Sequence, residues 1–166
     1  MKRSDNTKRA GFTLIEVLIA TAIIGIAIAA LMASNISHTQ ANAYGMHTST
    51  AEFLIGEIRA MTMPLEVVDP ESGTDTFGAE ADESSVTDYD DLDDFDGVTF
   101  NPPVDVGGNA LGDFSQYSQV VTVENLDPGD LTNVIADHGS SIVRISVTVS
   151  MNGKEISSTS WIRAEQ

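Results

Sequence analysis

Acidic residues are the side chains of this sequence whose number and spacing are best suited to chemistry. Residues 69–96 hold twelve acidic residues and no basic residue, and they are densest in DYDDLDDFDG, residues 88–97. Calcium takes several carboxylate and carbonyl oxygens as ligands, so this composition suits a calcium site. The candidate ligands in the dense part are Asp90, Asp91, Asp93, Asp94 and Asp96. The other acids of the run are Asp69, Glu71, Asp75, Glu80, Asp82, Glu83 and Asp88.

The spacing in this run differs from that of an EF-hand. Counting back from Gly97, the pattern D-x-D-x-D-G requires an acid at a position occupied by Leu92, and Pro103 replaces the later glutamate. The alternative is a long, solvated loop of variable conformation that binds no cofactor. Three residues spaced three apart would anchor one turn of such a loop on a core, namely Tyr89, Leu92 and Phe95.

Composition argues against catalysis and against nucleic-acid binding. The chain has no cysteine, and His38 and His47 lie nine residues apart, so neither a cysteine site nor a histidine metal pair on adjacent turns is formed. We find no glycine-rich phosphate loop and no nucleophile arrangement, so we expect no enzyme activity. After residue 11, 24 acidic and 4 basic residues remain, a net charge of −20. Such a surface repels nucleic acid and anionic lipid headgroups.

A long apolar run near the N-terminus contains one charged residue, Glu16, which is the other candidate functional residue of the sequence. Phe12 to Ala33 is 22 residues with one charge, which as a helix would span about 33 Å and cross a bilayer core. Basic residues precede the run, so the leader is expected in the cytoplasm and the remainder outside. A carboxylate inside such a span costs a few kcal/mol unless it is paired, or else it reaches water at the interface.

The string KRAGFTLIEVLIA, Lys8 to Ala20, resembles the class III signal of type IV prepilins and type II secretion pseudopilins. The match comprises a short basic leader, Gly11, Phe12, and an apolar helix with Glu16 as the fifth residue after that glycine. The resemblance implies cleavage between Gly11 and Phe12 by a membrane-embedded prepilin peptidase, and N-methylation of the new Phe12 amine.

The resemblance also implies partners and a location. Glu16 of one subunit would pair with the Phe12 amine of a neighbour, and breaking such a buried pair costs about 3–5 kcal/mol. The partners would be the prepilin peptidase, other pilin or pseudopilin subunits through the N-terminal helix, and an inner-membrane assembly platform. The protein would be a single-pass inner-membrane protein with an extracytoplasmic C-terminal domain, assembled into a periplasmic or cell-surface filament.

Helical periodicity continues beyond the apolar run. Pro64 is expected to end a helix that runs to about Met61 and is about 75 Å long. Its apolar stripe comprises Ile36, Ala43, His47, Ala51, Leu54, Ile58 and Met61. We expect this stripe to be covered by a sheet, and the two histidines to be surface or packing residues.

The last third of the sequence predicts antiparallel strands. Residues 118–125 and 141–151 read as strands, and Asn152-Gly153 predicts a two-residue hairpin turn. That turn pairs Val149 with Ile156, Val143 with Ile162, and Arg144 with Trp161. The fold class is therefore α+β, a long N-terminal helix packed by its second half on a small antiparallel sheet, as in pilins. The expected regions are a leader (1–11), a membrane or filament-core helix (12–33), its amphipathic continuation (34–63), an acidic loop (64–117) and a sheet (118–166).

Two departures from major pilins favour a minor pilin or pseudopilin. The chain cannot form the disulfide of many type IV pilins, and no helix-bending proline occurs between Phe12 and Met63. The string DDLDDFDG also resembles a segment of the D-type minor pilins of mannose-sensitive haemagglutinin pili. The expected function is a structural subunit of a type IV pilus or type II secretion-like filament. The alternative is a membrane-anchored, calcium-dependent binding module or adhesin.

Overall fold

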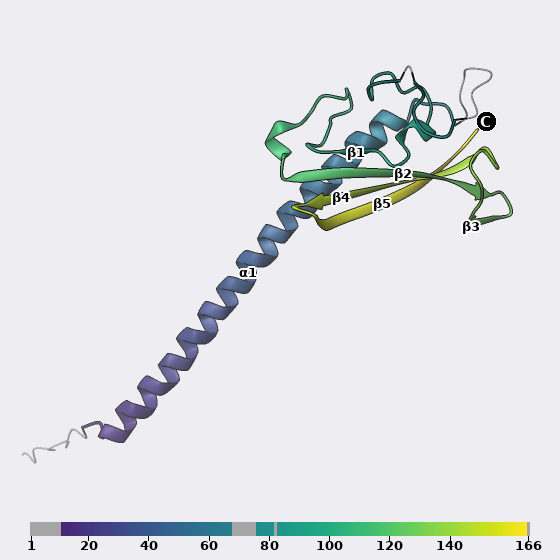
Figure 1. Ribbon diagram of the computed structural model, residues 1–166. Coiled ribbons are helices and arrows are strands. Elements are labelled where there is room, and N and C mark those ends of the chain that lie inside the picture. The colour runs from purple at the N-terminus through teal and green to yellow at the C-terminus, as the bar shows by residue number, and fades with distance from the viewer. Residues whose placement is uncertain (1–10, 68–75, 82, 166) are drawn as a thin grey trace, which may run out of the picture. The chain divides into compact units, whose positions relative to one another are not determined.

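The computed structural model describes residues 11–67, 76–81 and 83–165 (Figure 1). Within these residues the fold is α+β, with one long N-terminal helix followed by a five-stranded antiparallel sheet. The leader (1–10) and four of the acidic residues lie outside the described residues: Asp69, Glu71, Asp75 and Asp82.

The helices are α1 (Leu14–Thr62) and two short 3-10 turns, η1 (Asp93–Phe95) and η2 (Gly112–Phe114). The strands are β1 (Thr99–Phe100), β2 (Tyr117–Asp127), β3 (Asp130–Val134), β4 (Ile142–Met151) and β5 (Lys154–Ala164). The chain divides into two compact units, residues 1–45 and 46–166, and α1 contributes to both.

The second half of α1 supplies one side of the hydrophobic core. Ala51, Leu54 and Ile58 of the expected stripe are fully buried, and Ile55, which the stripe omitted, is buried with them. The expectation that the stripe is covered from Ile36 onward is wrong, because Ile36 and Ala43 are exposed.

The C-terminal end of α1 is held by a side chain from the last strand. Pro64 follows the helix, as the sequence predicted. The Arg163 guanidinium donates hydrogen bonds to the carbonyls of Thr62, Met63 and Leu65 at 3.0–3.2 Å. A cation at a helix C-terminus also complements the helix dipole, so this contact fixes where α1 ends.

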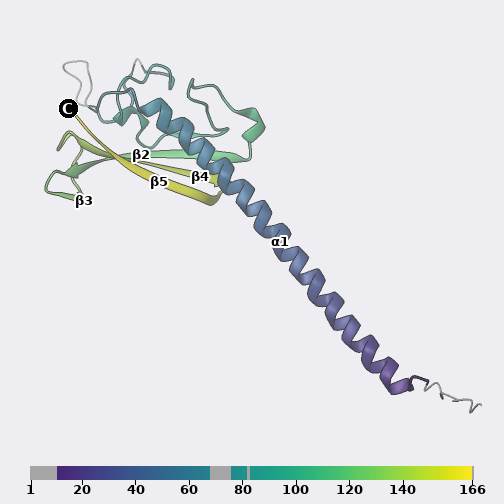
Figure 2. The same ribbon diagram turned by 180° about the vertical axis from the view of Figure 1, so that it is seen from behind.

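The sheet has the order β1-β2-β4-β5, with β3 paired to the far end of β2. Figure 2 shows β2, β4 and β5 running side by side as the main ribbon of the sheet. The predicted strands 118–125 and 141–151 correspond to β2 and β4. On β4 every second residue is buried, as the alternation required: Val143, Ile145, Val147 and Val149.

The Asn152-Gly153 hairpin is confirmed, but its predicted register is wrong. Both turn residues have positive φ, 50° and 78°, as a tight two-residue hairpin needs. Met151 pairs with Lys154, but a bulge at Ile156 then shifts all later pairs. Because a bulge adds one residue to one strand, the partners of the remaining strand residues are displaced by one position.

The shifted register decides which side chains of β5 face the core. Arg144 pairs with Ile162 instead of Trp161, and Trp161 pairs with the buried Ile145. Arg144 is therefore not opposite Trp161: the Arg144 guanidinium bonds Glu124 at 3.2 Å, and Arg59 of α1 lies 5.4 Å from the Trp161 ring centroid. The bulge thus turns Trp161 toward the helix.

A buried amide connects the helix, the sheet and the loop between them. Gln119 of β2 is fully buried, and its Nε2 donates to the carbonyls of Leu54 (2.9 Å) and Val104 (3.3 Å). Its Oε1 accepts the Val104 N–H at 2.8 Å. The amide nitrogen and the amide oxygen of Gln119 are both hydrogen-bonded, so the side chain can lie in the core without a large desolvation penalty.

Candidate functional site

The first turn of α1 carries the residues of the expected processing and assembly site. Gly11 and Phe12 precede the helix and are exposed. Thr13 stands immediately before the first helical residue, and Glu16 is in the first turn. The Thr13 N–H and hydroxyl each donate to Glu16 Oε2 at 3.2 Å, while the Glu16 N–H donates to the Thr13 hydroxyl at 3.3 Å. This reciprocal arrangement is a capping box.

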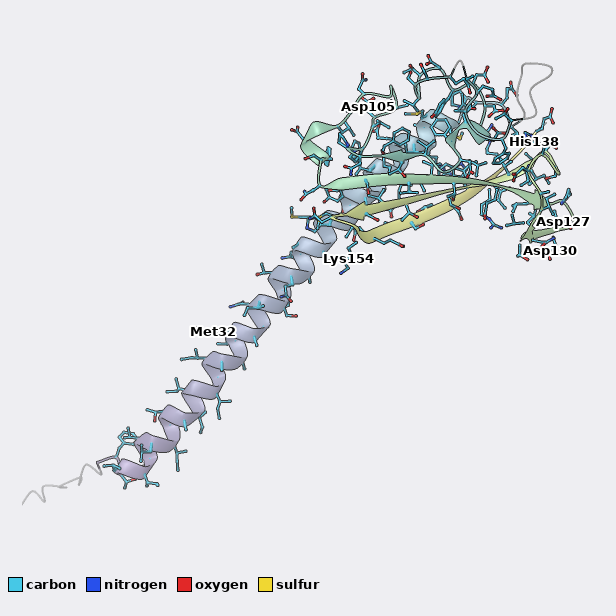
Figure 3. All side chains as sticks on the ribbon, viewed as in Figure 1. Met32, Asp105, Asp127, Asp130, His138 and Lys154 are labelled. Carbon is cyan, nitrogen blue, oxygen red and sulfur yellow. The ribbon has the colours of Figure 1, made fainter. Side chains whose placement is uncertain are left out.

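The helix behind this cap presents apolar side chains to its surroundings on all sides. The exposed fractions of Phe12 (84%), Ile26 (72%) and Leu31 (65%) show that these side chains are not covered by residues 11–67, 76–81 or 83–165. Met32, whose side chain points away from the helix in Figure 3, is 64% exposed. α1 is long and apolar enough to cross a membrane. A helix that is apolar all round is suited to lipid or to a bundle of similar helices.

The acidic loop contains a second candidate site, and part of it is buried. Asp91, Asp93 and Asp94 are 3%, 4% and 1% exposed, so the expectation of a fully solvated loop is wrong for these three. The cause is the expected anchor: Leu92 and Phe95 are fully buried, and they carry the neighbouring aspartates inward.

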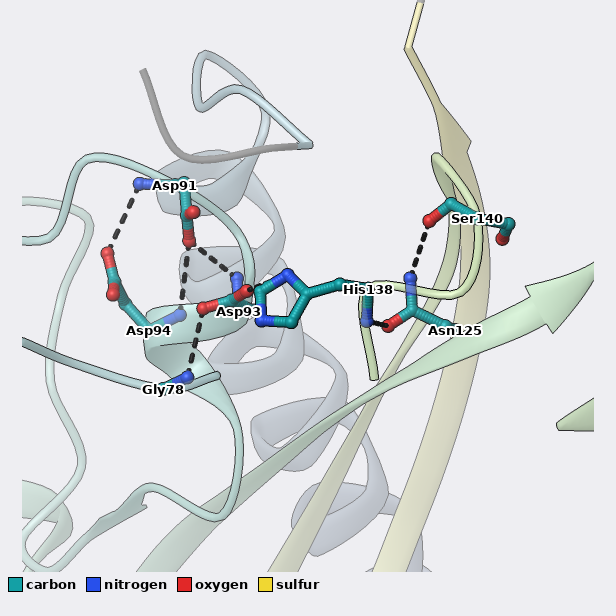
Figure 4. Close-up of polar contacts among 7 residues, drawn as sticks. All are labelled: Gly78, Asp91, Asp93, Asp94, Asn125, His138 and Ser140. Carbon is teal, nitrogen blue, oxygen red and sulfur yellow. Dashed lines mark hydrogen bonds and ion pairs between the residues drawn. The ribbon is translucent and has the colours of Figure 1, made fainter. Parts of the chain in front are cut away.

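The buried aspartates are held by backbone donors (Figure 4). Asp91 Oδ1 accepts the N–H groups of Asp93 (2.8 Å) and Asp94 (3.3 Å) and thereby caps η1. Asp94 Oδ2 accepts the N–H groups of Asp90 (3.0 Å) and Asp91 (3.2 Å). Local side-chain to backbone bonds of this kind favour a turn over a helix or strand, which accounts for the 3-10 geometry.

Asp93 contacts a different part of the chain from Asp91 and Asp94. Its Oδ1 accepts the Gly78 N–H at 3.0 Å, and its Oδ2 lies 4.0 Å from Nδ1 of His138 (Figure 4). Asp93 and His138 border a cavity of about 210 Å³ that is also lined by Phe77 and Asn125. His138 has a positive φ of 55° and donates its N–H to Asn125 Oδ1 at 3.0 Å.

Glu83 and Asp94 form a pair of carboxyl groups with opposite pKa shifts. Burial, together with hydrogen bonding to Glu83, raises the pKa of Asp94 to about 8. Burial acts to raise the pKa of Glu83 as well, but the Glu80 and Asp90 N–H groups and hydrogen bonding to Asp94 lower it below its usual value. The two carboxyl groups therefore favour sharing one proton, which leaves the pair with a single negative charge.

The candidate calcium ligands from the sequence are only partly brought together. Asp91, Asp93 and Asp94 offer oxygens within 4.8 Å of one another, whereas Asp96 accepts the Val123 N–H at 2.8 Å and Asp90 is exposed. A second group unites Asp94 with Glu80 and Glu83, again within 4.8 Å. Sequence reasoning did not select these two glutamates, because the folding of the loop brings them to Asp94.

The histidines of α1 behave as the sequence suggested. His38 is exposed, and His47 Nδ1 lies 2.7 Å from the Tyr117 hydroxyl, joining the helix to β2. Their positions do not form a shared site, and His47 acts in packing.

Comparison with known proteins adds one finding. Residues 6–32 match the family model described as the prokaryotic N-terminal methylation motif. Neither the curated proteins nor the solved structures give a match to the chain. The matched residues comprise the second half of the basic leader, the capped first turn and most of the apolar run, so this N-terminal part of the chain is type IV pilin-like.

Proposed function

We propose that this chain is a minor pilin or pseudopilin, cut between Gly11 and Phe12 by a prepilin peptidase and assembled through α1 into an envelope-spanning filament. The observation that carries the proposal is the exposure of the apolar side chains from Phe12 to Ile36, most of which lie inside the methylation motif. An apolar surface of this extent requires lipid before assembly and neighbouring helices after it.

Glu16 provides the specificity of assembly in this proposal. Cleavage after Gly11 gives Phe12 a cationic amine, and a neighbouring subunit's Glu16 neutralises it in the low dielectric of the helix bundle. Leaving either charge unpaired there costs about 3–5 kcal/mol, so a subunit docked in the wrong register is rejected.

The choice of a minor subunit is supported by α1 itself. The helix runs for 49 residues without a proline, and the described part of the chain has no disulfide. The DDLDDFDG string adds its resemblance to D-type minor pilins. We place the leader in the cytoplasm and the sheet domain outside, because basic residues precede the apolar run.

The mature N-terminus tests the proposal directly. We would co-express the full chain with a prepilin peptidase and determine its terminus by intact mass and terminal sequencing. We expect a start at N-methylated Phe12. The Gly11→Val variant should stay uncut, while Gly25→Ala, a helical position where an added Cβ meets nothing within 4 Å, should be processed normally.

Two other results would overturn the proposal. A start beyond Ala22 would mean ordinary signal-peptide cleavage and a secreted domain without a filament role. An uncut wild-type chain would mean a simple membrane anchor. If processing is confirmed, incorporation into sheared filaments of hosts that contain only the pilus platform or only the secretion platform would decide between the two systems.

A further inference from the structure

Asp94 has one carboxylate oxygen that the fold leaves unsatisfied. The residue is 1% exposed, and its Oδ2 accepts two backbone N–H groups. Its Oδ1 is also enclosed, yet no N–H or neutral hydroxyl group among the described residues donates to it, and the neighbouring Glu83 carboxyl group can do so only when a proton lies between them. Burying a polar oxygen without a donor is costly, and native proteins rarely tolerate it without an ion, a water or a proton.

Two further carboxylates converge on the same place. Glu80, Glu83 and Asp94 each offer an oxygen, and the three oxygens lie within 4.8 Å of one another. The Glu83 carboxylate is fixed by the N–H groups of Glu80 (3.0 Å) and Asp90 (3.2 Å). The Asp90 N–H is shared between Glu83 and Asp94, which locks the two carboxylates side by side.

Among the described residues, no ion pair joins a lysine or arginine to this cluster, and Arg163 instead donates to the carbonyls at the C-terminal end of α1. No lysine or arginine occurs in the sequence between Arg59 and Arg144. Arg59 lies over Trp161, and Arg144 bonds Glu124, so each has another partner. The negative charge at Asp94 must therefore be balanced from outside the chain, either by a proton or by a bound cation.

We propose that Glu80, Glu83 and Asp94 form a calcium site. Calcium binds oxygen ligands at about 2.3–2.6 Å, so three carboxylate oxygens within 4.8 Å of one another are close enough to contact one ion. Magnesium requires shorter bonds and a near-ideal octahedron, to which this loop is less suited. Glu80 and Glu83 are half-buried, so water can complete the coordination.

Asp91 and Asp93 are assigned supporting roles. Asp91 Oδ1 is used by the N–H groups of η1, and the two oxygens of Asp93 face Gly78 and His138. These contacts shape the turn that carries Asp94. The proposed ligand set is therefore narrower than the candidates in the sequence, and it includes two glutamates from outside the dense acidic string.

A calcium ion at this position would connect two parts of the loop. Residues 80–83 would be tied to η1, whose Phe95 is fully buried against the core. The protein has no cysteine, so no disulfide can hold this segment. The ion would take the role of such a covalent link in an extracytoplasmic domain.

Calcium titration of the full chain in detergent micelles tests the site. After removal of metals with EDTA, we expect one saturable site by calorimetry and a thermal midpoint that rises with calcium concentration. Glu80→Gln and Glu83→Gln should each weaken binding about tenfold or more, because each removes a charged ligand. Asp113→Asn, which neutralises an exposed carboxylate of η2, should leave the affinity within about twofold.

The competing explanation is a proton shared by Glu83 and Asp94. In that case calcium and magnesium would raise the midpoint equally, without saturation, and equally in the wild type and in all three variants. That result would overturn the proposal. The glutamate variants keep the test valid if Asp94→Asn fails to fold, since each must show a cooperative transition in EDTA before its affinity is compared.

Discussion

Thr13 and Glu16 cap each other at the first turn of α1, with the Thr13 N–H and hydroxyl donating to Glu16 and the Glu16 N–H donating to Thr13. Within a single chain, Glu16 is thus already satisfied as a hydrogen-bond acceptor. Its negative charge, however, has no ion-pair partner among the described residues. A capping role and a charge-pairing role for Glu16 can therefore be separated by substitution.

Glu16→Gln should retain the cap but lose filament incorporation. The amide oxygen still accepts from Thr13, whereas the charge that would pair with a neighbouring Phe12 amine is gone. Glu16→Val should insert into the membrane and be equally excluded. Thr13→Ala, which removes only the cap at a cost of about 1 kcal/mol, should still assemble. Immunoblots of sheared filaments measure the outcome, and wild-type incorporation of Glu16→Gln would disprove the charge role.

Stability without calcium should fall as pH rises from about 4 to about 8. Asp94 has a pKa of about 8 in the folded protein against an ordinary 3.8, so the folded state binds more protons in that interval. The contribution of Asp94 to the free energy of unfolding is therefore complete below about pH 4, and it is lost as Asp94 ionises. The carboxyl groups of Glu80, Glu83 and Asp91 and the Tyr89 phenol are the ionisable groups nearby.

Urea unfolding in EDTA at a series of pH values measures the slope of the unfolding free energy against pH. Asp94→Asn should flatten it, because the amide does not titrate, while Asp113→Asn should leave it unchanged. The comparison is needed because other acids of this highly charged chain also titrate. An identical slope in wild type and Asp94→Asn would show that Asp94 carries an ordinary pKa.

Gln119→Leu should destabilise the sheet domain by about 1–3 kcal/mol. The substitution leaves the Val104 N–H buried without a partner and removes the second hydrogen bond of the Leu54 carbonyl, and an unsatisfied buried group costs about that much. Gln116→Leu, at an exposed position next to the start of β2, is the matched control and should change stability by less than about 0.5 kcal/mol. Equal denaturation midpoints for the two variants would contradict this role.

Terbium bound in place of calcium should be sensitised by Tyr89. The Tyr89 ring packs edge-to-face on Phe95 at 5.0 Å, and its pKa is raised by burial and by the charges of Asp94 and Glu83, which places it beside the proposed site. Tyr89→Phe should reduce terbium emission without preventing calcium binding. Emission that survives this change but depends on Trp161 would place the ion elsewhere.

The sequence predicted the parts of this fold that depend on local pattern. The apolar run with Glu16, the long helix and the Asn152-Gly153 hairpin each follow from spacing along one element. The register of β4 and β5 could not be derived, because nothing in the residue types marks Ile156 as a bulge. A bulge depends on how the whole strand fits the core, as the inward position of Trp161 shows.

In the acidic loop, too, local pattern predicted some features and could not predict others. The apolar spacing of Leu92 and Phe95 predicted an anchored turn, and both residues are buried. That anchoring also buries Asp93 and Asp94, although acidic residues in a turn-rich segment are ordinarily exposed. Glu80 and Glu83 reach Asp94 only because the chain folds back over more than ten residues, a contact that no local pattern encodes.

Strand β5 forms one border of the sheet, since the strand order ends with it. A border strand with free backbone groups can recruit a strand from another molecule. β5 carries charged residues near both ends, with Lys154 (Figure 3) and Glu155 at its start and Arg163 near its end. Its middle, residues 157–160, consists of four residues with hydroxyl side chains. In the filament proposed above, such a border would discourage pairing between the sheets of neighbouring subunits. Contacts between subunits would then be left to the N-terminal helices.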